Sequence, residues 1–491
     1  MTSVGVDCSQ IASQGILKQD NMRAGRVLIE CGVVRGGQAT GPEDAPLVAP
    51  NIQVSNRACA DGASCTKSEN SVWGSTKNNG NTIVVNYNDH NPGGSLNYTG
   101  TSVSLDAGAT FKEILPPPFS TGHGDNFGDP IVVFNSKLNK WYAGDLADGC
   151  GGQGIGLWSS KTAKTWKVGA CAHTGGGDDR ESMWVDNEPT SGTYGRMYVS
   201  WNDFNNNGAL SVVYSDNGTS WSAPVILNPN FIRDVQITGS PRGATRFEGA
   251  NSTVFVAAMD EGGGGFATRQ NIMYKSLDGG VTWTASTLGP RFKPVGQGSC
   301  DNAYFVKVNP IWRHMGWGEP AVGPTGVVHY AYAGAGATKA DPGDIFYVRS
   351  VDNGNTWSAP VKLNTDKDAK FSTQWMPSVS SDLNGKVTVS WYDRRAAKTA
   401  CVNVSDPGCQ YERVGVQSAT NGASFLAPIT ISAALIPQPA QNDPGVQACY
   451  AGDYDYSTAL NGNAYVTWTD GSVNVGGTQV QNVDFAKVPL P

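Results

Sequence analysis

The stretch "SLDGGVTW", residues 276–283, decides the fold because it returns along the whole chain. Three further copies are close matches, one of them ending in Phe: "SLDAGATF" (104–111), "YSDNGTSW" (214–221) and "SVDNGNTW" (350–357). Two copies are degraded: "SSKTAKTW" (159–166) and "SATNGASF" (418–425). Successive copies begin about 55–75 residues apart, a period typical of a repeat architecture.

Each residue type in this repeat suits a tight turn. Asp or Asn tolerates the left-handed backbone region and accepts N–H bonds within the turn. Gly permits a positive φ, Ser or Thr adds a hydroxyl bond, and the final Trp or Phe packs between sheets. We therefore interpret the repeat as a corner that joins the outer strands of a sheet through buried hydrogen bonds, and not as a catalytic motif.

Short β-rich runs precede each turn, as in "GRMYVSWND" followed by "ALSVVYS". Three or four short antiparallel strands per period are typical of a propeller blade. After the sixth turn, "DYSTALNGNAYVTWTDG" and "QNVDFAKV" supply three more strands, and "NIQVSN" (51–56) can supply a fourth. The sequence therefore predicts an all-β, seven-bladed propeller over residues 51–491, whose N-terminal strand closes the last blade. Residues 1–50 are expected to pack on its outside.

The repeats closely resemble the Asp-box, S-x-D-x-G-x-T-W, of the sialidase superfamily, and they cover roughly residues 68–430. This resemblance implies a propeller but leaves the reaction open, because lectins, sorting receptors and glycan enzymes share the box. The whole-chain layout is also similar to seven-bladed polysaccharide lyases, among them a fungal lyase that removes rhamnose from the 4-linked glucuronate of gum arabic. Sialidases carry an Arg-Ile-Pro stretch before the first box, and nothing of that form precedes Ser104.

The composition narrows the possible partners. The chain has 491 residues and a net charge of −7, which argues against nucleic acid and against an anionic membrane surface. A closed propeller needs no second subunit, so we expect a monomer. The segments "DGCGGQG" (148–154), "GGGDD" (175–179) and "DPGD" (341–344) could hold a structural Ca²⁺, and no other cofactor is expected.

The cysteines indicate an oxidising compartment. Of the ten, three pairs are close enough in sequence to close small loops: Cys59 with Cys65, Cys150 with Cys171, and Cys401 with Cys409. The remaining four are Cys8, Cys31, Cys300 and Cys449. Four Asn-x-Ser/Thr acceptor sites begin at Asn97, Asn217, Asn251 and Asn403. Together these features favour a secreted glycoprotein whose leader peptide has been removed.

One face of the propeller is expected to carry the site. The loops that lead into the first strand of each blade, with those joining the second and third strands, place Arg180, Arg246, Arg394 and Arg395 there. Such cations suit a sugar carboxylate held by bidentate guanidinium groups. Trp317 and Trp375 would then stack on pyranose rings, with Glu248, Glu319 and Asp453 as further substrate contacts. The alternative is that each Arg pairs with an acidic neighbour.

A lyase acting on a uronate needs a cation to neutralise the carboxylate, a base for the C5 proton and an acid for the departing O4. His90, in the turn "NYNDHNPGG", is the first candidate for acid/base work, ahead of His123 and His314. Tyr392, Tyr450 and Tyr454 are possible proton partners. The predicted catalytic set is therefore His90, Arg180, Arg246, Tyr392 and Tyr450.

Three functions fit these observations. The first is β-elimination that releases L-rhamnose from rhamnosyl-α-1,4-glucuronate ends of a plant polysaccharide. The second is hydrolysis of an acidic sugar by a sialidase-type enzyme, and the third is glycan binding without catalysis. A lectin tends to repeat its sugar site in every blade. Here the boxes repeat while the channel segments differ, which favours one asymmetric active site.

Overall fold

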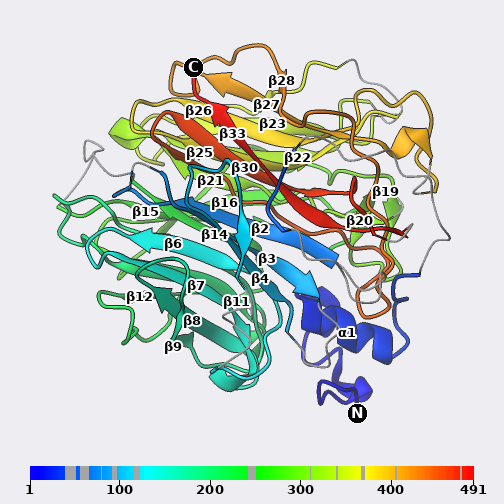
Figure 1. Cartoon of the computed structure of the whole chain (residues 1–491), viewed down its shortest axis with the longest axis horizontal. Coiled ribbons are helices and arrows are strands. Elements are labelled where there is room, and N and C mark those ends of the chain that lie inside the picture. The colour runs from blue at the N-terminus through cyan, green and yellow to red at the C-terminus, as the bar shows by residue number, and fades with distance from the viewer. Residues whose placement is uncertain are drawn as a thin grey trace.

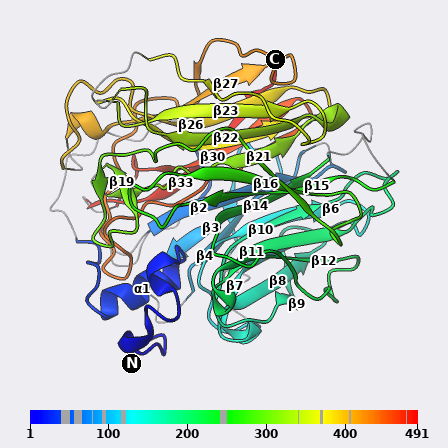
Figure 2. The ribbon, with the colours of Figure 1, turned by 180° about the vertical axis from the view of Figure 1, so that it is seen from behind.

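A computed structural model describes most of the chain, and its strands form a ring of sheets (Figures 1 and 2). The described residues are 1–38, 51–55, 66–78, 80–90, 97–114, 122–240, 250–309, 311–338, 341–366, 371–403, 406–475 and 478–491. Among them, no helix is both long and apolar enough to cross a membrane. The Cys59–Cys65 pairing, Arg246 and Glu248 lie outside these residues.

Seven four-stranded antiparallel sheets make up the ring. Blades 1 to 3 comprise β2 (Thr66–Gly74), β3 (Ile83–His90), β4 (Thr99–Ser104), β5 (Lys112–Glu113); β6 (Ile131–Asn135), β7 (Lys140–Ala147), β8 (Gly154–Ser160), β9 (Lys167–His173); and β10 (Asp178–Val185), β11 (Met197–Asp203), β12 (Ala209–Ser215), β13 (Val225–Asn228). Blades 4 to 6 comprise β14 (Arg233–Gly239), β15 (Val254–Asp260), β16 (Gln270–Ser276), β17 (Thr284–Thr287); β21 (Glu319–Val322), β22 (Val328–Gly334), β23 (Asp344–Ser350), β24 (Val361–Lys362); and β25 (Gln374–Ser381), β26 (Val387–Asp393), β27 (Glu412–Ser418), β28 (Ile429–Thr430).

The two ends of the propeller sequence meet in blade 7. Its strands follow the order β29 (Thr458–Leu460), β30 (Asn463–Asp470), β33 (Asn482–Pro489) and β1 (Ile52–Gln53). β1 pairs antiparallel with β33, with Ile52 opposite Phe485. The prediction of seven blades closed by the N-terminal strand is therefore confirmed. β1 therefore supplies the outermost strand of blade 7 and covers the edge of β33 that would otherwise be unpaired.

The apolar core lies between adjacent blades. One cluster joins Val84 of blade 1 to Val132 of blade 2, and another joins Leu210 of blade 3 to Val256 of blade 4. Comparable clusters continue around the ring, and Val85 with Phe485 completes it between blades 1 and 7. The first strands, β2, β6, β10, β14, β21, β25 and β29, contact their neighbours in a circle. The polar side chains of these strands therefore meet at the centre.

Three segments lie outside the blades. Residues 1–38 carry η1 (Cys8–Gln10), η2 (Ile16–Lys18) and α1 (Met22–Glu30), and α1 lies beside β3 and β4 in both ribbon views (Figures 1 and 2). A small sheet of β18 (Gly298–Ser299), β19 (Val306–Asn309) and β20 (Trp312–Arg313) is inserted between blades 4 and 5. β31 (Asn474–Val475) and β32 (Thr478–Gln479) form a ribbon before β33. Short 3-10 turns complete the fold: η4 (Asp148–Cys150), η5 (Phe204–Asn206), η6 (Pro324–Gly326) and η7 (Pro407–Cys409).

Four disulfides are present among the described residues: Cys8–Cys31, Cys150–Cys171, Cys300–Cys449 and Cys401–Cys409. The expected Cys150–Cys171 and Cys401–Cys409 pairs are confirmed. Disulfides in this number are typical of proteins that fold in an oxidising compartment. Two of the four glycan acceptor residues use their side chains internally, because Asn97 accepts from Asn126 and Asn217 forms part of a turn.

The box turns join the third and fourth strands of blades 1 to 6, as predicted. In the copy at 276–283, the buried Ser276 hydroxyl accepts from the Gly280 N–H at 2.9 Å, and the Asp278 carboxylate accepts from Thr282 N–H at 2.9 Å. Asp278 itself is exposed, so the expectation that its bonds are buried was wrong. In the copy at 214–221, Asn217 takes the Asp role, and Asp216 instead pairs with Arg196 at 2.8 Å.

Removal of the closing strand should unfold the whole ring. A chain that ends after Asp470 lacks β33, which pairs with both β30 and β1, and blade 7 then cannot hold blades 1 and 6 together. We expect this truncated protein to show no cooperative thermal transition. A truncated protein that melts like the full chain would contradict ring closure as the basis of stability.

The box should contribute to stability and not to activity. Ser276→Ala leaves the Gly280 N–H without its acceptor, and we expect the free energy of unfolding to fall by about 1–3 kcal/mol. Thr284→Ala, at an exposed position of β17, is the control and should change it by less than about 0.5 kcal/mol. Urea denaturation measures both. Full stability with lost turnover in Ser276→Ala would argue that the boxes belong to the site.

Candidate active site at the centre of the ring

Bulges in four first strands shape the centre of the ring. The pairing register shifts near the start of four first strands, where each pairs with the second strand of its blade: β2, β10, β14 and β25. Within these shifts Glu69, Arg180, Asp234 and Met376 adopt left-handed φ values of 43°, 57°, 59° and 50°. A bulge re-aims its side chain out of the regular ladder, and a left-handed non-glycine residue costs about 1–3 kcal/mol. Strained residues at equivalent places in four blades make this end of the channel a candidate functional site.

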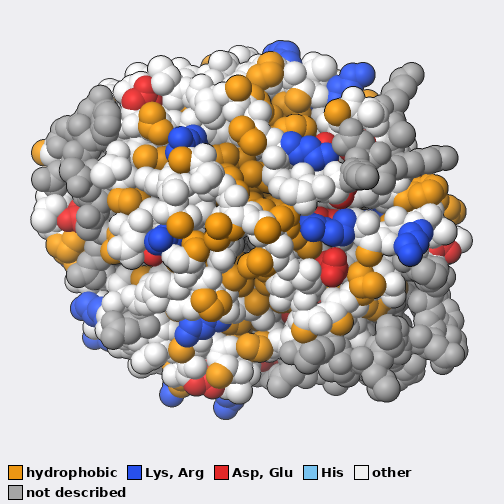
Figure 3. All heavy atoms as spheres, turned by 90° about the horizontal axis from the view of Figure 1, so that it is seen from above, with side chains coloured by type: hydrophobic (Ala, Val, Ile, Leu, Met, Phe, Trp, Pro, Cys, Tyr) orange, Lys and Arg blue, Asp and Glu red, His pale blue; other side chains and the backbone are white. Residues whose placement is uncertain are grey.

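Three arginines converge there, and each has a carboxylate partner within the propeller. Arg180 Nη2 lies 3.0 Å from Asp234 Oδ1 and Arg233 Nη1 lies 2.5 Å from Asp179 Oδ2. Arg313 Nη2 lies 2.5 Å from Asp453 Oδ2, and its Nε lies 3.0 Å from the other oxygen. All three guanidinium groups are buried. Surface cations are distributed differently: Figure 3 shows described Lys and Arg side chains scattered singly over one face.

A fourth carboxylate, Asp20, reaches the arginines from the N-terminal segment. Its Oδ2 contacts Arg233 Nη2 and lies 3.4 Å from Arg180 Nη1, while its backbone carbonyl accepts from Arg313 Nη2 at 2.7 Å. Burial alone would raise the pKa of Asp20, but Arg233, Arg180 and Arg313 outweigh burial, and the pKa is lowered. Asp20 is therefore an anion shared by the cluster.

The Arg180 guanidinium lies between two aromatic rings. Its central carbon is 4.6 Å from the Trp317 ring centroid and 4.4 Å from that of Tyr454. The Trp317 indole N–H donates to Glu261 at 2.7 Å, which fixes one side of this cation–π sandwich. The Tyr454 hydroxyl has no hydrogen-bond partner among the described residues. A phenol held against a cation and free of other bonds is available for proton transfer.

Burial favours the protonated form of several carboxyl groups nearby. Burial raises the pKa values of Glu69, Asp129 and Glu181 well above their usual range, and neighbouring carboxylates raise them further. Burial also raises the pKa of Asp179 to about 7 and that of Asp234 to about 6. The centre of the ring therefore carries few full negative charges besides those paired with the arginines.

Two groups of side chains lie close enough together to suggest a metal ion. Asp20, Asp129 and Asp179 form one, but Arg180 and Arg233 already bind two of these carboxylates. His123 with Cys150 and Cys171 forms the other, and those cysteines are joined in a disulfide, which removes the thiolates that a metal would need. Neither group fits a cation, and the predicted structural Ca²⁺ stays an untested prediction.

A cavity of about 330 Å³ opens at the opposite end of the channel. The second halves of the first strands line it, including Trp184, Gln236, Glu319 and Tyr456. Gln236 Nε2 donates to Asp234 at 3.3 Å, so the cavity floor lies directly behind the Arg180–Asp234 pair. Burial keeps the pKa of Glu319 well above its usual range. The predicted substrate contact Glu319 therefore belongs to this cavity.

Four predicted site residues lie in or beside the arginine cluster. Arg180, Trp317 and Asp453 belong to it directly. Tyr450 lies next to it, with its ring 5.1 Å from the Arg313 guanidinium carbon and its hydroxyl accepting from Asn88 at 2.8 Å. The alternative, in which each Arg pairs with an acidic sequence neighbour, is confirmed for Arg395, which pairs with Asp393, whereas Arg180 pairs with Asp234 of the next blade.

Three predicted site residues are structural instead. Trp375 is fully buried and stacks on Tyr392 at 5.3 Å in the core, so it cannot reach a sugar. The Tyr392 hydroxyl is already bonded to Asp455 at 2.5 Å and to the Thr469 N–H at 2.6 Å. The buried Arg394 guanidinium donates to the Gly408 carbonyl at 2.8 Å. These placements correct the expectation that all three face the substrate.

The histidines are spread over the molecule. His90 ends β3, bonds to Asp443 through Nδ1 and stacks on Tyr98 at 5.0 Å. No contact among the described residues joins it to the arginines. His314 lies at the centre, where burial, with the Arg180 charge, lowers its pKa to about 3, so it stays neutral. His123 packs edge-on against Trp158. The role predicted for His90 stays a prediction.

Sequence reasoning missed Asp20, Glu69, Arg233, Asp234 and Arg313. Arg313 stands in a segment already placed on the correct face, "WRHMGWGEP" (312–320). An alignment of the first strands on their bulges would have found Arg233 and Asp234. In that alignment "IRDV" (232–235) of blade 4 occupies the position of "DDRE" (178–181) in blade 3. Nothing in the sequence places Asp20, because its partners are at least 159 residues away.

Comparisons with known proteins give distant structural similarity. No protein-family model matches the chain, and no curated protein sequence matches it. Among solved structures, an ulvan lyase bound to -[GlcA(1-4)Rha3S]- is 11% identical with a TM-score of 0.46, over 93% of this chain and 95% of that one. A Penicillium chrysogenum α-L-arabinanase complexed with arabinobiose is 11% identical with a TM-score of 0.39, over 90% and 98%. The NanB sialidase of Streptococcus pneumoniae is 12% identical with a TM-score of 0.41, over 90% and 71%.

These structural neighbours include glycoside hydrolases, a polysaccharide lyase and a sialidase. At such identities they assign no family to the chain. The choice of reaction therefore depends on the side chains at the centre of the ring.

The raised carboxyl pKa values predict that stability falls as pH rises. Burial raises the pKa of Asp179 to about 7, of Asp234 to about 6 and of Asp455 to about 7, against about 3.9 in an unfolded chain. The folded state therefore holds protons that the unfolded state has lost, and the stability that they contribute below about pH 4 disappears as pH passes through about 6 to 7. We expect the free energy of unfolding to decrease between about pH 5 and 8.

Urea denaturation at several pH values measures this slope. Asp179→Asn should make this slope shallower. Asp260→Asn should not, because partial burial raises the pKa of this surface carboxyl but its hydrogen bonds and Arg291 lower it further. A slope of opposite sign in the unmodified protein would show that these carboxyls are ionised in the folded state.

Proposed function

We propose that the chain is a secreted enzyme that acts on a sugar bearing a carboxylate. The observation that carries this proposal is the convergence of Arg180, Arg233 and Arg313 on Asp20. Guanidinium groups arranged around one carboxylate provide the recognition that a uronate or another acidic sugar requires. Asp20 thus stands where the carboxylate of a ligand would bind. We infer a monomer with an oligosaccharide or polysaccharide as its partner and no nucleic-acid or membrane partner.

The reaction that we favour is β-elimination from a 4-linked uronate. The arginines neutralise the carboxylate and make the C5 proton more acidic. The Tyr454 phenolate takes that proton, the C5–H electrons form the C4–C5 double bond, and the C4–O4 bond breaks. The departing O4 receives the proton from the Tyr454 phenol. The protons and electrons of this elimination balance without a cofactor.

Tyr454 can perform this step because of its position. Its ring packs against Arg180 at 4.4 Å and its hydroxyl is uncommitted among the described side chains. Burial, together with Glu69 and Asp129, raises its pKa well above the usual range, and Arg180 opposes that rise. Entry of substrate and water would reduce the contribution of burial, which favours the phenolate. The first substrate to test is rhamnosyl-α-1,4-glucuronate in gum arabic, whose cleavage would release L-rhamnose and leave an unsaturated uronate.

One observation favours a sialidase-type hydrolase as the second candidate. The Glu69 carboxyl accepts from the backbone N–H of Asp453, the residue before Tyr454, and it is among the charges acting on the Tyr454 hydroxyl. A Tyr nucleophile with a Glu as its proton acceptor would attack an anomeric carbon. The products would then be saturated sugars.

Tyr454→Phe tests both reactions with little risk to folding. The substitution removes only a hydroxyl that has no partner in the described structure, so the melting temperature should not fall. Turnover of gum arabic should drop by about 100- to 10,000-fold, the range for loss of a proton-transfer group. Tyr98→Phe, which removes another uncommitted hydroxyl away from the arginines, is the matched control.

The products decide between the reactions. Ultraviolet absorbance of a conjugated uronate supports β-elimination, whereas reducing sugars without that absorbance support hydrolysis. Full activity in folded Tyr454→Phe would remove Tyr454 from both mechanisms. Binding of acidic oligosaccharides without any turnover would favour the non-catalytic glycan-binding propeller.

A further inference from the structure

The N-terminal segment, residues 1–38, is built as a unit of its own. Its apolar side chains Val6, Ile16, Ala24, Val27, Leu28 and Val34 form a cluster to which no blade contributes. The Cys8–Cys31 disulfide links the start of this unit to the end of α1. Met22 alone among its described residues joins a core cluster of the propeller. The segment can therefore keep its internal structure when it leaves the ring.

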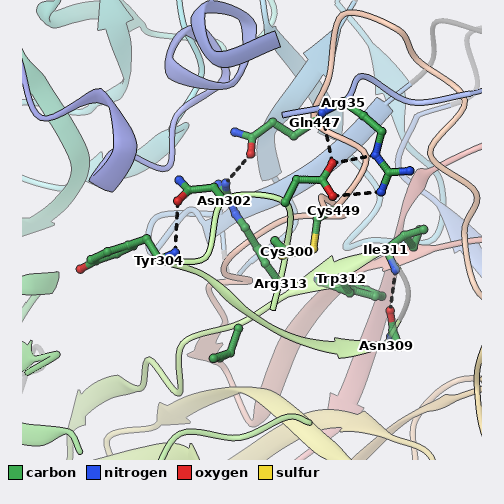
Figure 4. The surroundings of a disulfide bond; sticks show 12 residues. Arg35, Cys300, Asn302, Tyr304, Asn309, Ile311, Trp312, Arg313, Gln447 and Cys449 are labelled. Atoms are coloured by element: carbon green, nitrogen blue, oxygen red, sulfur yellow. Dashed lines mark hydrogen bonds and ion pairs between the residues drawn. A yellow bond between two sulfur atoms is a disulfide. The ribbon is translucent and has the colours of Figure 1, made fainter. Parts of the chain in front are cut away.

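Polar contacts hold the segment on the ring. Arg23 donates to Gln153 at 2.7 Å, Asn302 donates to the Leu17 carbonyl at 2.7 Å, and Gly37 donates to the Asp443 carbonyl at 2.9 Å. Arg35 pairs with the exposed Asp301 at 2.9 Å, and Figure 4 shows Arg35 close to the Cys300–Cys449 disulfide and to the inserted segment that carries Trp312 and Arg313. Water can replace the Arg35–Asp301 pair, because exposed ion pairs contribute about 0–1 kcal/mol, whereas the buried Asn21 amide also donates to Asp179 and has to be released when the segment leaves.

Asp20 is an anion that the arginines share, and its hydrogen bonding is incomplete. Each arginine keeps a propeller carboxylate of its own, Asp234, Asp179 or Asp453, so none depends on Asp20 for charge balance. The Asp20 carboxylate engages Arg180 and Arg233 through Oδ2 alone, and its buried Oδ1 has no hydrogen-bond partner among the described residues. The Arg180 Nε is likewise without one. A free carboxylate could satisfy both groups better than Asp20 does.

The same contacts close the site. With the segment in place, Arg180, Arg233 and Arg313 are at most 1% exposed, so a sugar carboxylate cannot reach them from this face. We propose that residues 1–38 are an autoinhibitory segment in which Asp20 occupies the carboxylate position of the substrate, and that an acidic sugar binds by displacing it. This inference rests on the proposed function, because it takes the arginine cluster to be the substrate site.

Asp20→Asn tests the displacement directly. The amide keeps the shape of the side chain and loses the charge that competes for the arginines. We expect the variant to bind sodium D-glucuronate at least about tenfold more tightly than the unmodified protein, because the fraction of protein with an open site rises. Isothermal titration calorimetry measures this, and D-glucose serves as the uncharged probe. Asp7→Asn makes the same charge change at an exposed place in the same segment and should have no effect.

Hydrogen exchange of the unmodified protein gives a second readout that requires no variant. Saturating D-glucuronate should increase amide exchange in α1, because the segment leaves the ring, whereas D-glucose should not. Unchanged or slower exchange in α1 would overturn the proposal, as would equal or weaker glucuronate binding by folded Asp20→Asn. Tighter binding with faster exchange, but no turnover of any acidic glycan, would retain the autoinhibitory segment and reject the proposed enzyme.

Discussion

Buried charges at the centre of the ring must be paired, and this requirement links the fold to the site. Arg180 of blade 3 pairs with Asp234 of blade 4, while Arg233 of blade 4 pairs back with Asp179 of blade 3. Removal of one member of such a buried pair typically costs about 3–5 kcal/mol. The blades can therefore meet only in the arrangement that brings these residues together, and that arrangement also gathers three guanidinium groups at the centre of the ring.

The rest of the molecule provides stability that offsets the backbone strain and the buried charge at the centre of the ring. Apolar clusters between neighbouring blades form a continuous belt around the channel, and the box turns fasten the outer strands through local hydrogen bonds such as that of Ser350 with the Gly354 N–H. The bulges that hold left-handed Glu69, Arg180, Asp234 and Met376 lie in inner strands, and burial raises the pKa of several carboxyls there, including Glu69. This separation agrees with the prediction that the repeated motif is structural and that a site would use residues that differ between blades.

The sequence predicted the features that local signals determine. Box turns, blade number, closure by residues 51–56 and two short disulfide loops all depend on residues near one another or on counting repeats. The site depends on which way a side chain points at a bulge, and a one-residue shift of the ladder turns it to the other side. Trp375 and the bulge residue Met376 both pack into the apolar core, whereas Arg180, the bulge residue of blade 3, lies in the arginine cluster. Composition and spacing alone do not distinguish these positions.

Exchange of one carboxylate for another keeps the central charge constant. When an acidic sugar replaces Asp20, the guanidinium groups face the same number of anions before and after, so displacement costs little electrostatic free energy. A neutral sugar would leave Arg180 and Arg233 with one carboxylate each, Asp234 and Asp179, and the cluster with one anion fewer than when Asp20 or an acidic sugar is bound. The charge pairing between the blades therefore also disfavours uncharged ligands. Because the N-terminal segment covers the arginines, only a ligand that replaces the charge of Asp20 opens the site.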